Sequence, residues 1–133
     1  MNKSSQLHAT FNITSLSAIE AIKVAFAEAE KVKVKVSVAV VDTYLSLIAF
    51  SKGDGATPHS VETSRRKANT AASTGKATGW MEKELAKTLP MASGNLLTNI
   101  PGGVPLRFDG VLGEGWEFPG EQLSKTMKLL GQH

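Results

Sequence analysis

The sequence predicts an α+β domain in which helices pack on an antiparallel sheet. Three features carry this prediction: a segment of alternating valines, apolar residues at helical spacing on either side of it, and an Asp-Gly turn between two later apolar stretches. The expected order is α-β-β-α-α-β-β-α. Residues 1–133 suit a single domain, in which residues 1–14 are expected to form a flexible or partner-contacting segment.

The first half of the chain predicts a helix followed by two strands. The helix should begin at the capping box Ser-Ala-Ile-Glu of residues 17–20 and run to about residue 30, with an apolar face made by Ile19, Ile22, Phe26 and Ala29. Residues 32–40 should form a strand, because valine occupies every even position and would face the core. Asp42 begins a turn, residues 45–50 return as the partner strand, and the Gly-Asp-Gly cluster at residues 53–55 ends it.

The second half predicts two helices, a hairpin and a last helix. A helix should start at Pro58 or Ser60, with a small face for close packing made by Ala68, Ala71 and Ala72. Residues 80–89 should form the next helix, ended by Pro90. Strands at 104–108 and 111–118 would flank the type I′ turn Asp109-Gly110, and a short amphipathic helix carrying Leu123, Met127 and Leu130 would close the chain.

The composition excludes several classes of protein. Without cysteine there is no disulfide scaffold, thiol nucleophile or thiolate metal site, and the histidines His8, His59 and His133 lack metal-ligand spacing, so no metal site is expected. The net charge is only +3, the basic residues are dispersed and aromatics make up 6%, so nucleic-acid binding is not expected. No apolar run of about 18 residues or secretory leader is visible. We expect a cytoplasmic protein without membrane contact.

Four motifs, in this order and spacing, resemble signature stretches of the GlcG/HbpS-like family, which includes the C-terminal domain of PduO-type proteins. They are Val38-Ala39-Val40-Val41-Asp42, Asp54-Gly55-Ala56, Lys67-Ala68-Asn69-Thr70-Ala71 and Gly102-Gly103-Val104-Pro105. The resemblance implies a profilin-like fold with a five-stranded antiparallel sheet and a homo-oligomer, either a dimer or a larger ring. Family roles include haem binding, association with glycolate or propanediol utilisation, and a lyase acting on an aryl hydroxylamine. The chain departs from the family pattern at Lys52-Gly53 and over residues 113–120.

Lys67 is the first candidate site residue, since it matches the lysine of the family's Lys-Ala pair. A partly buried ammonium beside a cleft can bind a carboxylate or a haem propionate, or act as a general base if desolvation lowers its pKa. The alternative is a structural lysine that extends along its helix and pairs with an acid. Asp42 and Asp54 follow apolar strands, where aspartate usually fixes a turn. The alternative is a catalytic or ligand-orienting carboxylate, and Asp54 is the stronger candidate of the two for this role.

The remaining candidates come from the glycine motif, one histidine and one tryptophan. Gly102 and Gly103, followed by Pro105, could present amides to an anionic group, or simply form a turn into a strand. His59 could be an axial haem ligand or a general acid/base, or an exposed helix-start residue. Trp116 could line a ligand pocket or a subunit interface, or pack in the core.

These residues leave three functions open. The first is binding of a small planar or anionic organic ligand, with haem as the leading cofactor. The second is a cofactor-independent lyase or isomerase acting on a small organic acid or aromatic compound, with Lys67 or Asp54 transferring the proton. The third is a structural subunit of a catabolic assembly.

Overall fold

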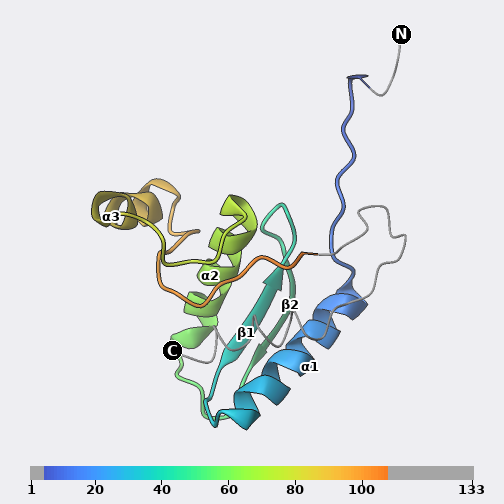
Figure 1. The fold of residues 1–133 in the computed structure, drawn as a ribbon, viewed down its shortest axis with the longest axis vertical. Coiled ribbons are helices and arrows are strands. Elements are labelled where there is room, and N and C mark those ends of the chain that lie inside the picture. Colours follow the sequence, from blue (N-terminus) through green and yellow to red (C-terminus); the bar gives the residue numbers. More distant parts are fainter. Residues whose placement is uncertain (1–4, 108–133) are drawn as a thin grey trace.

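The computed structural model describes residues 5–107 of the chain. They form, in order, α1 (Ser15–Lys31), β1 (Ser37–Val41), β2 (Leu47–Lys52), α2 (Ser60–Thr74) and α3 (Lys83–Ala92). The two strands pair antiparallel, α1 packs on both of them and α2 packs mainly on β1, so β1 lies between these helices (Figure 1). The predicted mixture of helices and antiparallel strands is confirmed for these five elements. Because the described sheet has two strands, the predicted five-stranded sheet stays a prediction.

The core lies where α1 meets β1. Val38 and Val40 point from the strand toward an apolar stripe on the helix, which consists of Ala18, Ala21, Ile22 and Ala25. These positions recur every three or four residues, so they share one face of the helix. Alternate residues of β1 are therefore buried, as the valine pattern predicts, whereas Ile19 is 46% exposed and does not belong to the buried face.

The start of α1 corrects the predicted cap. Thr14 is the N-cap, and its side-chain oxygen accepts a hydrogen bond of 3.2 Å from the amide of Ser17. A hydroxyl in this position satisfies one of the amides that a helix start leaves without a partner. The capping box predicted at residues 17–20 is therefore wrong, because the chain is already helical from Ser15.

The end of α1 explains why the following strand starts late. Lys33 has a left-handed φ of 55°, its amide donates to the carbonyl of Glu30, and the amide of Val34 donates to the carbonyl of Ala29. This pair of hydrogen bonds is a Schellman motif, which ends a helix and redirects the chain. The alternating pattern therefore becomes a strand only at Ser37 and not at residue 32.

A tight turn joins the two strands. The Asp42 carboxylate accepts hydrogen bonds from the amides of Tyr44 (2.8 Å) and Ser46 (3.0 Å), and Leu45 adopts a left-handed φ of 64°. Aspartate fixes turns in this way. Strand β2 begins after this turn, two residues later than predicted, and it ends at Lys52, beside the glycine cluster that was expected to end it.

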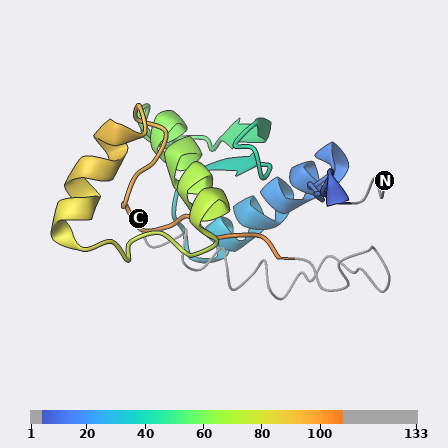
Figure 2. The same cartoon turned by 90° about the horizontal axis from the view of Figure 1, so that it is seen from above.

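The two later helices differ in how well the sequence predicts them. Helix α2 begins at Ser60, one of the predicted positions, and ends before Gly75, whose φ is 70°. Helix α3 begins at Lys83 with Glu82 as its cap, and Pro90 lies inside it. A proline in the last turn removes one intrahelical hydrogen bond, but the amide of Ser93 still donates to Leu89, so the helix continues past it. Both views place α3 beyond α2, on the side away from α1 (Figure 2).

The last described segment returns toward β1 without forming a strand. Residues 104–107, predicted to begin a hairpin, belong to no strand in the structure. Pro105 has no amide hydrogen for a strand ladder, and the guanidinium of Arg107 donates to the carbonyl of Gly75 over 2.6 Å. The strand predicted at 111–118 and the last helix lie outside the described residues. Within residues 5–107 no helix is long and apolar enough to cross a membrane.

Candidate functional site

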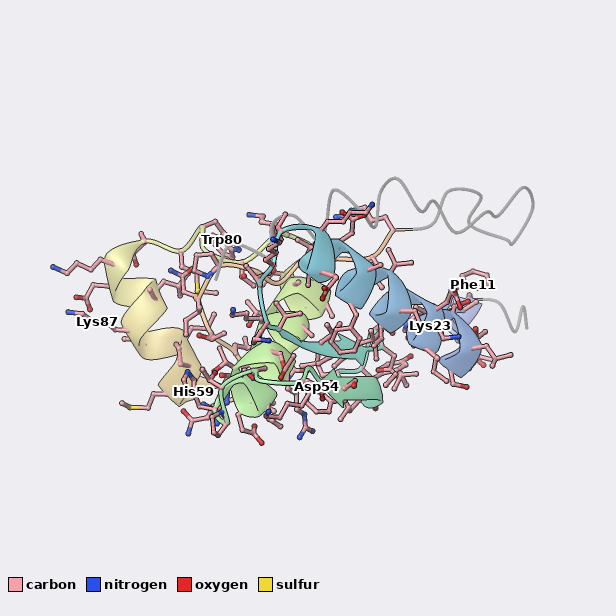
Figure 3. All side chains as sticks on the ribbon, turned by 90° about the horizontal axis from the view of Figure 1, so that it is seen from below. Phe11, Lys23, Asp54, His59, Trp80 and Lys87 are labelled. Atoms are coloured by element: carbon pink, nitrogen blue, oxygen red, sulfur yellow. The ribbon has the colours of Figure 1, made fainter. Side chains whose placement is uncertain are left out.

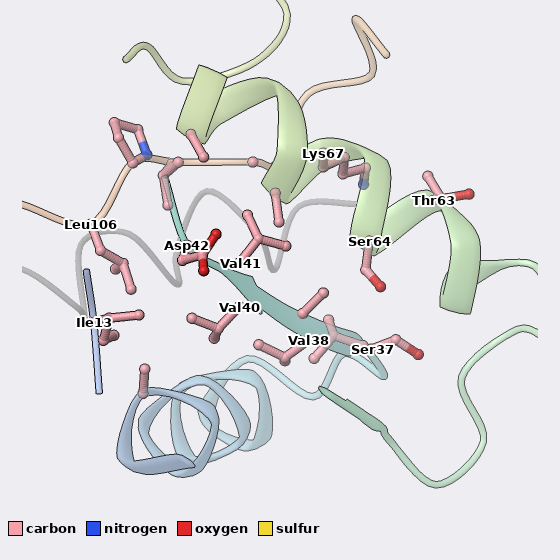
Figure 4. Close-up of a pocket in the computed structure, with 18 of the residues that line it drawn as sticks. Ile13, Ser37, Val38, Val40, Val41, Asp42, Thr63, Ser64, Lys67 and Leu106 are labelled. Carbon is pink, nitrogen blue, oxygen red and sulfur yellow. The ribbon is translucent and has the colours of Figure 1, made fainter. Parts of the chain in front are cut away.

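A hollow of about 850 Å³ lies over β1, between α2 and residues 103–107 (Figure 4). Every residue of β1 lines it, as do residues 11–14 ahead of α1. Figure 4 shows Ile13 and Leu106 at one end of the hollow, and Ser37, Ser64 and Lys67 at the other. The hollow therefore has an apolar end and a polar end.

The polar end is built by one face of α2. Ser60, Thr63, Ser64 and Lys67 stand at intervals of three and four residues, so they share a helix face, and all of them line the hollow. The hydroxyl of Ser60 lies 2.7 Å from that of Ser37, which joins the helix to the strand across the hollow. This end presents hydroxyl groups and one ammonium group.

Lys67 is partly buried in this end. Within residues 5–107, no acid and no hydrogen-bond acceptor engages its ammonium group. Desolvation by burial lowers the pKa of Lys67 from its ordinary value of 10.5, because burial penalises the charged form. The alternative of a structural lysine paired with an acid therefore finds no partner in the described part of the chain.

The backbone of Lys67 is in close contact with Gly103. A Cβ atom at Gly103 would lie 2.3 Å from the carbonyl oxygen of Lys67, so only glycine allows this approach. Two hydrogen bonds to Thr78 hold Gly103 in place: its amide donates to the Thr78 hydroxyl, and its carbonyl accepts from the Thr78 amide, both over 2.9 Å. The buried Thr78 hydroxyl in turn donates to the carbonyl of Ile100. This arrangement fixes the wall of the hollow opposite β1.

The charged groups around the hollow are mostly basic. Lys35 and Arg107 line it together with Lys67, while Asp42 is its acidic residue among those described. One oxygen of the Asp42 carboxylate already accepts two backbone hydrogen bonds in the turn. The hollow therefore favours a ligand that carries negative charge.

His59 and Asp54 lie in the connection between β2 and α2 (Figure 3). His59 lines the hollow at its rim, is exposed, and makes no capping hydrogen bond with its side chain although it occupies the N-cap position of α2. Asp54 is exposed and is not among the lining residues. The structure therefore brings His59, and not Asp54, to the same hollow as Lys67.

Only part of the predicted glycine motif lines the hollow. Gly103 and Pro105 line the hollow, whereas Gly102 is buried beside it with a left-handed φ of 124°. The amide of Gly103 is already donated to Thr78, so it is not directed at a ligand. Trp116 lies outside the described residues, and its role stays a prediction.

Several lining residues were missed by the sequence reasoning. Ser60, Thr63 and Ser64 precede Lys67 at helical spacing, and this polar periodicity was the signal that could have found them. Lys35 also lines the hollow but belongs to none of the four motifs. Thr78, which holds Gly103 without lining the hollow itself, carries no motif at all. Its role depends on a contact 25 residues along the chain, which no local pattern indicates.

The comparisons with known proteins agree with this geometry. The sequence model described as haem degrading protein HbpS-like matches residues 13–114, a span that includes Lys67, Gly103 and all of β1. No curated protein is significantly similar to this chain.

Solved structures share the fold. A double mutant of Streptomyces reticuli HbpS is 27% identical with a TM-score of 0.70, covering 95% of this chain and 89% of its own. HbpS is 28% identical with a TM-score of 0.70, covering 100% of this chain and 99% of its own. Klebsiella pneumoniae protein ORFY is similar in fold alone: it is 20% identical with a TM-score of 0.71, covering 98% of this chain and 93% of its own.

Proposed function

The chain belongs to the HbpS-like family, and from this premise we propose that its hollow binds a small planar or anionic organic ligand, with haem as the first candidate. The observation that carries the proposal is Lys67, whose ammonium group is unpaired within residues 5–107 and stands at the polar end of a partly apolar hollow. Such a hollow suits a ligand with an apolar body and an acidic group at one side.

The residues present are compatible with haem. The hollow of about 850 Å³ falls within the usual range of ligand pockets, about 300–1,000 Å³. Lys67, Lys35 and Arg107 are cations suited to propionate groups, and Ala39 and Val41 of β1 together with the alanines of α2 provide an apolar wall. His59 at the rim is the imidazole that could reach iron. Bound haem supplies an iron centre, while these residues bind and orient the porphyrin.

The test is a haemin titration of the purified protein followed by Soret absorbance. Lys67→Ala should weaken binding about tenfold or more, since a charge-assisted contact contributes roughly 1.5–3 kcal/mol. His59→Ala should shift the Soret band. Two matched controls lie outside the lining: Lys52→Ala removes an exposed lysine and His8→Ala an exposed histidine, and both should leave the titration unchanged. Non-saturating adsorption that all variants share would overturn the proposal.

A second candidate function is a lyase or isomerase that moves a proton on a small organic acid or aromatic compound. The lowered pKa of Lys67 favours it, because a desolvated amine is a better general base near neutral pH. Asp54 is the weaker partner for this chemistry, since it does not line the hollow. Turnover that survives Lys67→Ala in a folded protein would exclude this mechanism.

We also propose self-association, as a dimer or a larger ring. Among the exposed large apolar side chains of the described part, Leu7 (75%), Leu16 (80%) and Met91 (81%) are the most exposed, and burying them in an interface would be favourable. Light scattering coupled to size-exclusion chromatography measures the mass directly, and a monomer at high protein concentration would refute the proposal.

A further inference from the structure

The surroundings of Lys67 bear on the reactivity of its amine as well as on ligand binding. Its amine faces a hollow that can admit a ligand, it stands on a face of hydroxyl groups and not of acids, and within residues 5–107 nothing neutralises or holds its charge. A lysine that only binds anions works best fully protonated, and solvent or a nearby acid maintains that state. The surroundings of Lys67 instead lower its pKa, which raises the fraction of neutral amine at a given pH.

We propose that Lys67 is a nucleophilic amine that forms an imine with small carbonyl compounds, with aldehydes or ketones that carry an acidic group as the preferred class. The acidic group is expected because Lys35 and Arg107 also line the hollow, so the charged groups around it are mostly basic. This goes beyond reversible ligand binding and does not depend on haem.

The hydroxyl groups on the helix face support this chemistry. Thr63 and Ser64, one turn before Lys67, donate their hydroxyl hydrogens to the carbonyls of His59 and Val61, both over 3.1 Å. Their oxygen lone pairs therefore remain as neutral acceptors on the helix face that carries Lys67, and neither oxygen is bonded to its amine. Neutral hydroxyl groups stabilise an ammonium ion less than a carboxylate does. Desolvation acts in the same direction and lowers the pKa of Lys67.

The reaction balances without a cofactor. The nitrogen lone pair of neutral Lys67 forms a bond to the carbonyl carbon, the carbonyl oxygen takes up a proton, and the nitrogen loses one, which gives a carbinolamine. The carbon–oxygen bond then breaks, the hydroxyl group takes up a proton and leaves as water, and the nitrogen gives up its remaining proton as its lone pair forms the carbon–nitrogen double bond. Hydrolysis reverses both steps, so the adduct is transient unless it is reduced.

The test traps this adduct in the unmodified protein. 4-Carboxybenzaldehyde with sodium cyanoborohydride converts an imine into a stable secondary amine, and peptide mass spectrometry shows which lysine carries it. At neutral pH we expect Lys67 to be modified at least about threefold faster than the exposed Lys52, although exposure alone would favour Lys52. In urea the two lysines should react equally, because the preference depends on the fold.

The outcomes separate this proposal from the binding proposal. Lys67 modified no faster than Lys52 in the folded protein, or Lys35 modified in its place, would overturn the imine proposal whatever the haemin titration shows. Selective modification of Lys67 in a protein that does not bind haemin would support the imine proposal and exclude haem as the ligand. Lys67→Arg keeps the positive charge and lacks the reactive amine, so the corresponding peptide should carry no adduct.

Discussion

Replacing Gly103 by alanine tests the wall of the hollow most directly. The added Cβ atom would lie 2.3 Å from the carbonyl oxygen and 2.7 Å from the carbonyl carbon of Lys67. The carbonyl belongs to helix α2 and cannot move alone, so the segment that contains Gly103 must shift away by about an ångström. That shift stretches both hydrogen bonds between Gly103 and Thr78. At roughly 1 kcal/mol each, plus lost packing, Gly103→Ala should lower the free energy of unfolding by about 2–3 kcal/mol.

The assay is urea unfolding followed by far-ultraviolet circular dichroism. Gly94→Ala is the matched control, because a Cβ atom at Gly94 meets nothing within 4 Å and only its left-handed φ of 68° is unfavourable. Gly94→Ala should therefore lower the free energy of unfolding by about 1 kcal/mol. Haemin binding should also weaken in Gly103→Ala and not in Gly94→Ala, since only the first displaces the wall. A Gly103→Ala protein within about 0.5 kcal/mol of the parent would refute the close contact with α2.

Two further predictions concern single lysines. Lys33 occupies the left-handed position of a Schellman motif, so Lys33→Gly should raise the free energy of unfolding by about 1 kcal/mol. Lys23→Gly, within α1, should lower it by about as much. Urea unfolding measures both changes, and two changes of the same sign would contradict the Schellman motif at Lys33. Because the folded pKa of Lys67 lies below 10.5, the unfolded chain binds more protons between these two values, and the free energy of unfolding should rise with pH through that window. Lys67→Met should flatten this rise in unfolding curves measured from about pH 7 to about pH 10, and an unchanged slope would exclude the lowered pKa.

The sequence predicts the elements of this fold better than their ends. Alternating valines identify β1 because one face of a strand is buried, and the structure buries Val38 and Val40 as expected. The start of the strand was misplaced because the same alternation continues back through Lys33, where two backbone hydrogen bonds decide the conformation. Pro90 was expected to end α3, but its position in the last turn makes the lost hydrogen bond tolerable.

In the candidate site, residues that belong to sequence motifs could be predicted, whereas residues that act through long-range contacts could not. Lys67 and Gly103 were identified through motifs, and the structure places both at the hollow. Asp54 was favoured over Asp42, yet its side chain is exposed and does not line the hollow, whereas Asp42 and the neighbouring Gly55 do. Thr78 could not be predicted, because its importance comes from hydrogen bonds to Gly103 and Ile100 that exist only once the chain has folded.

Helix α3 packs against no other helix or strand of the described part, and none of its residues is buried. Its amides therefore depend on local hydrogen bonds and not on the core between α1 and β1. Under native conditions they should exchange with deuterium through local opening, at a lower free energy than global unfolding, while the amides of β1 exchange only when the whole domain unfolds. A ligand that orders the hollow should slow exchange in β1 and α2 and leave the exchange of α3 unchanged.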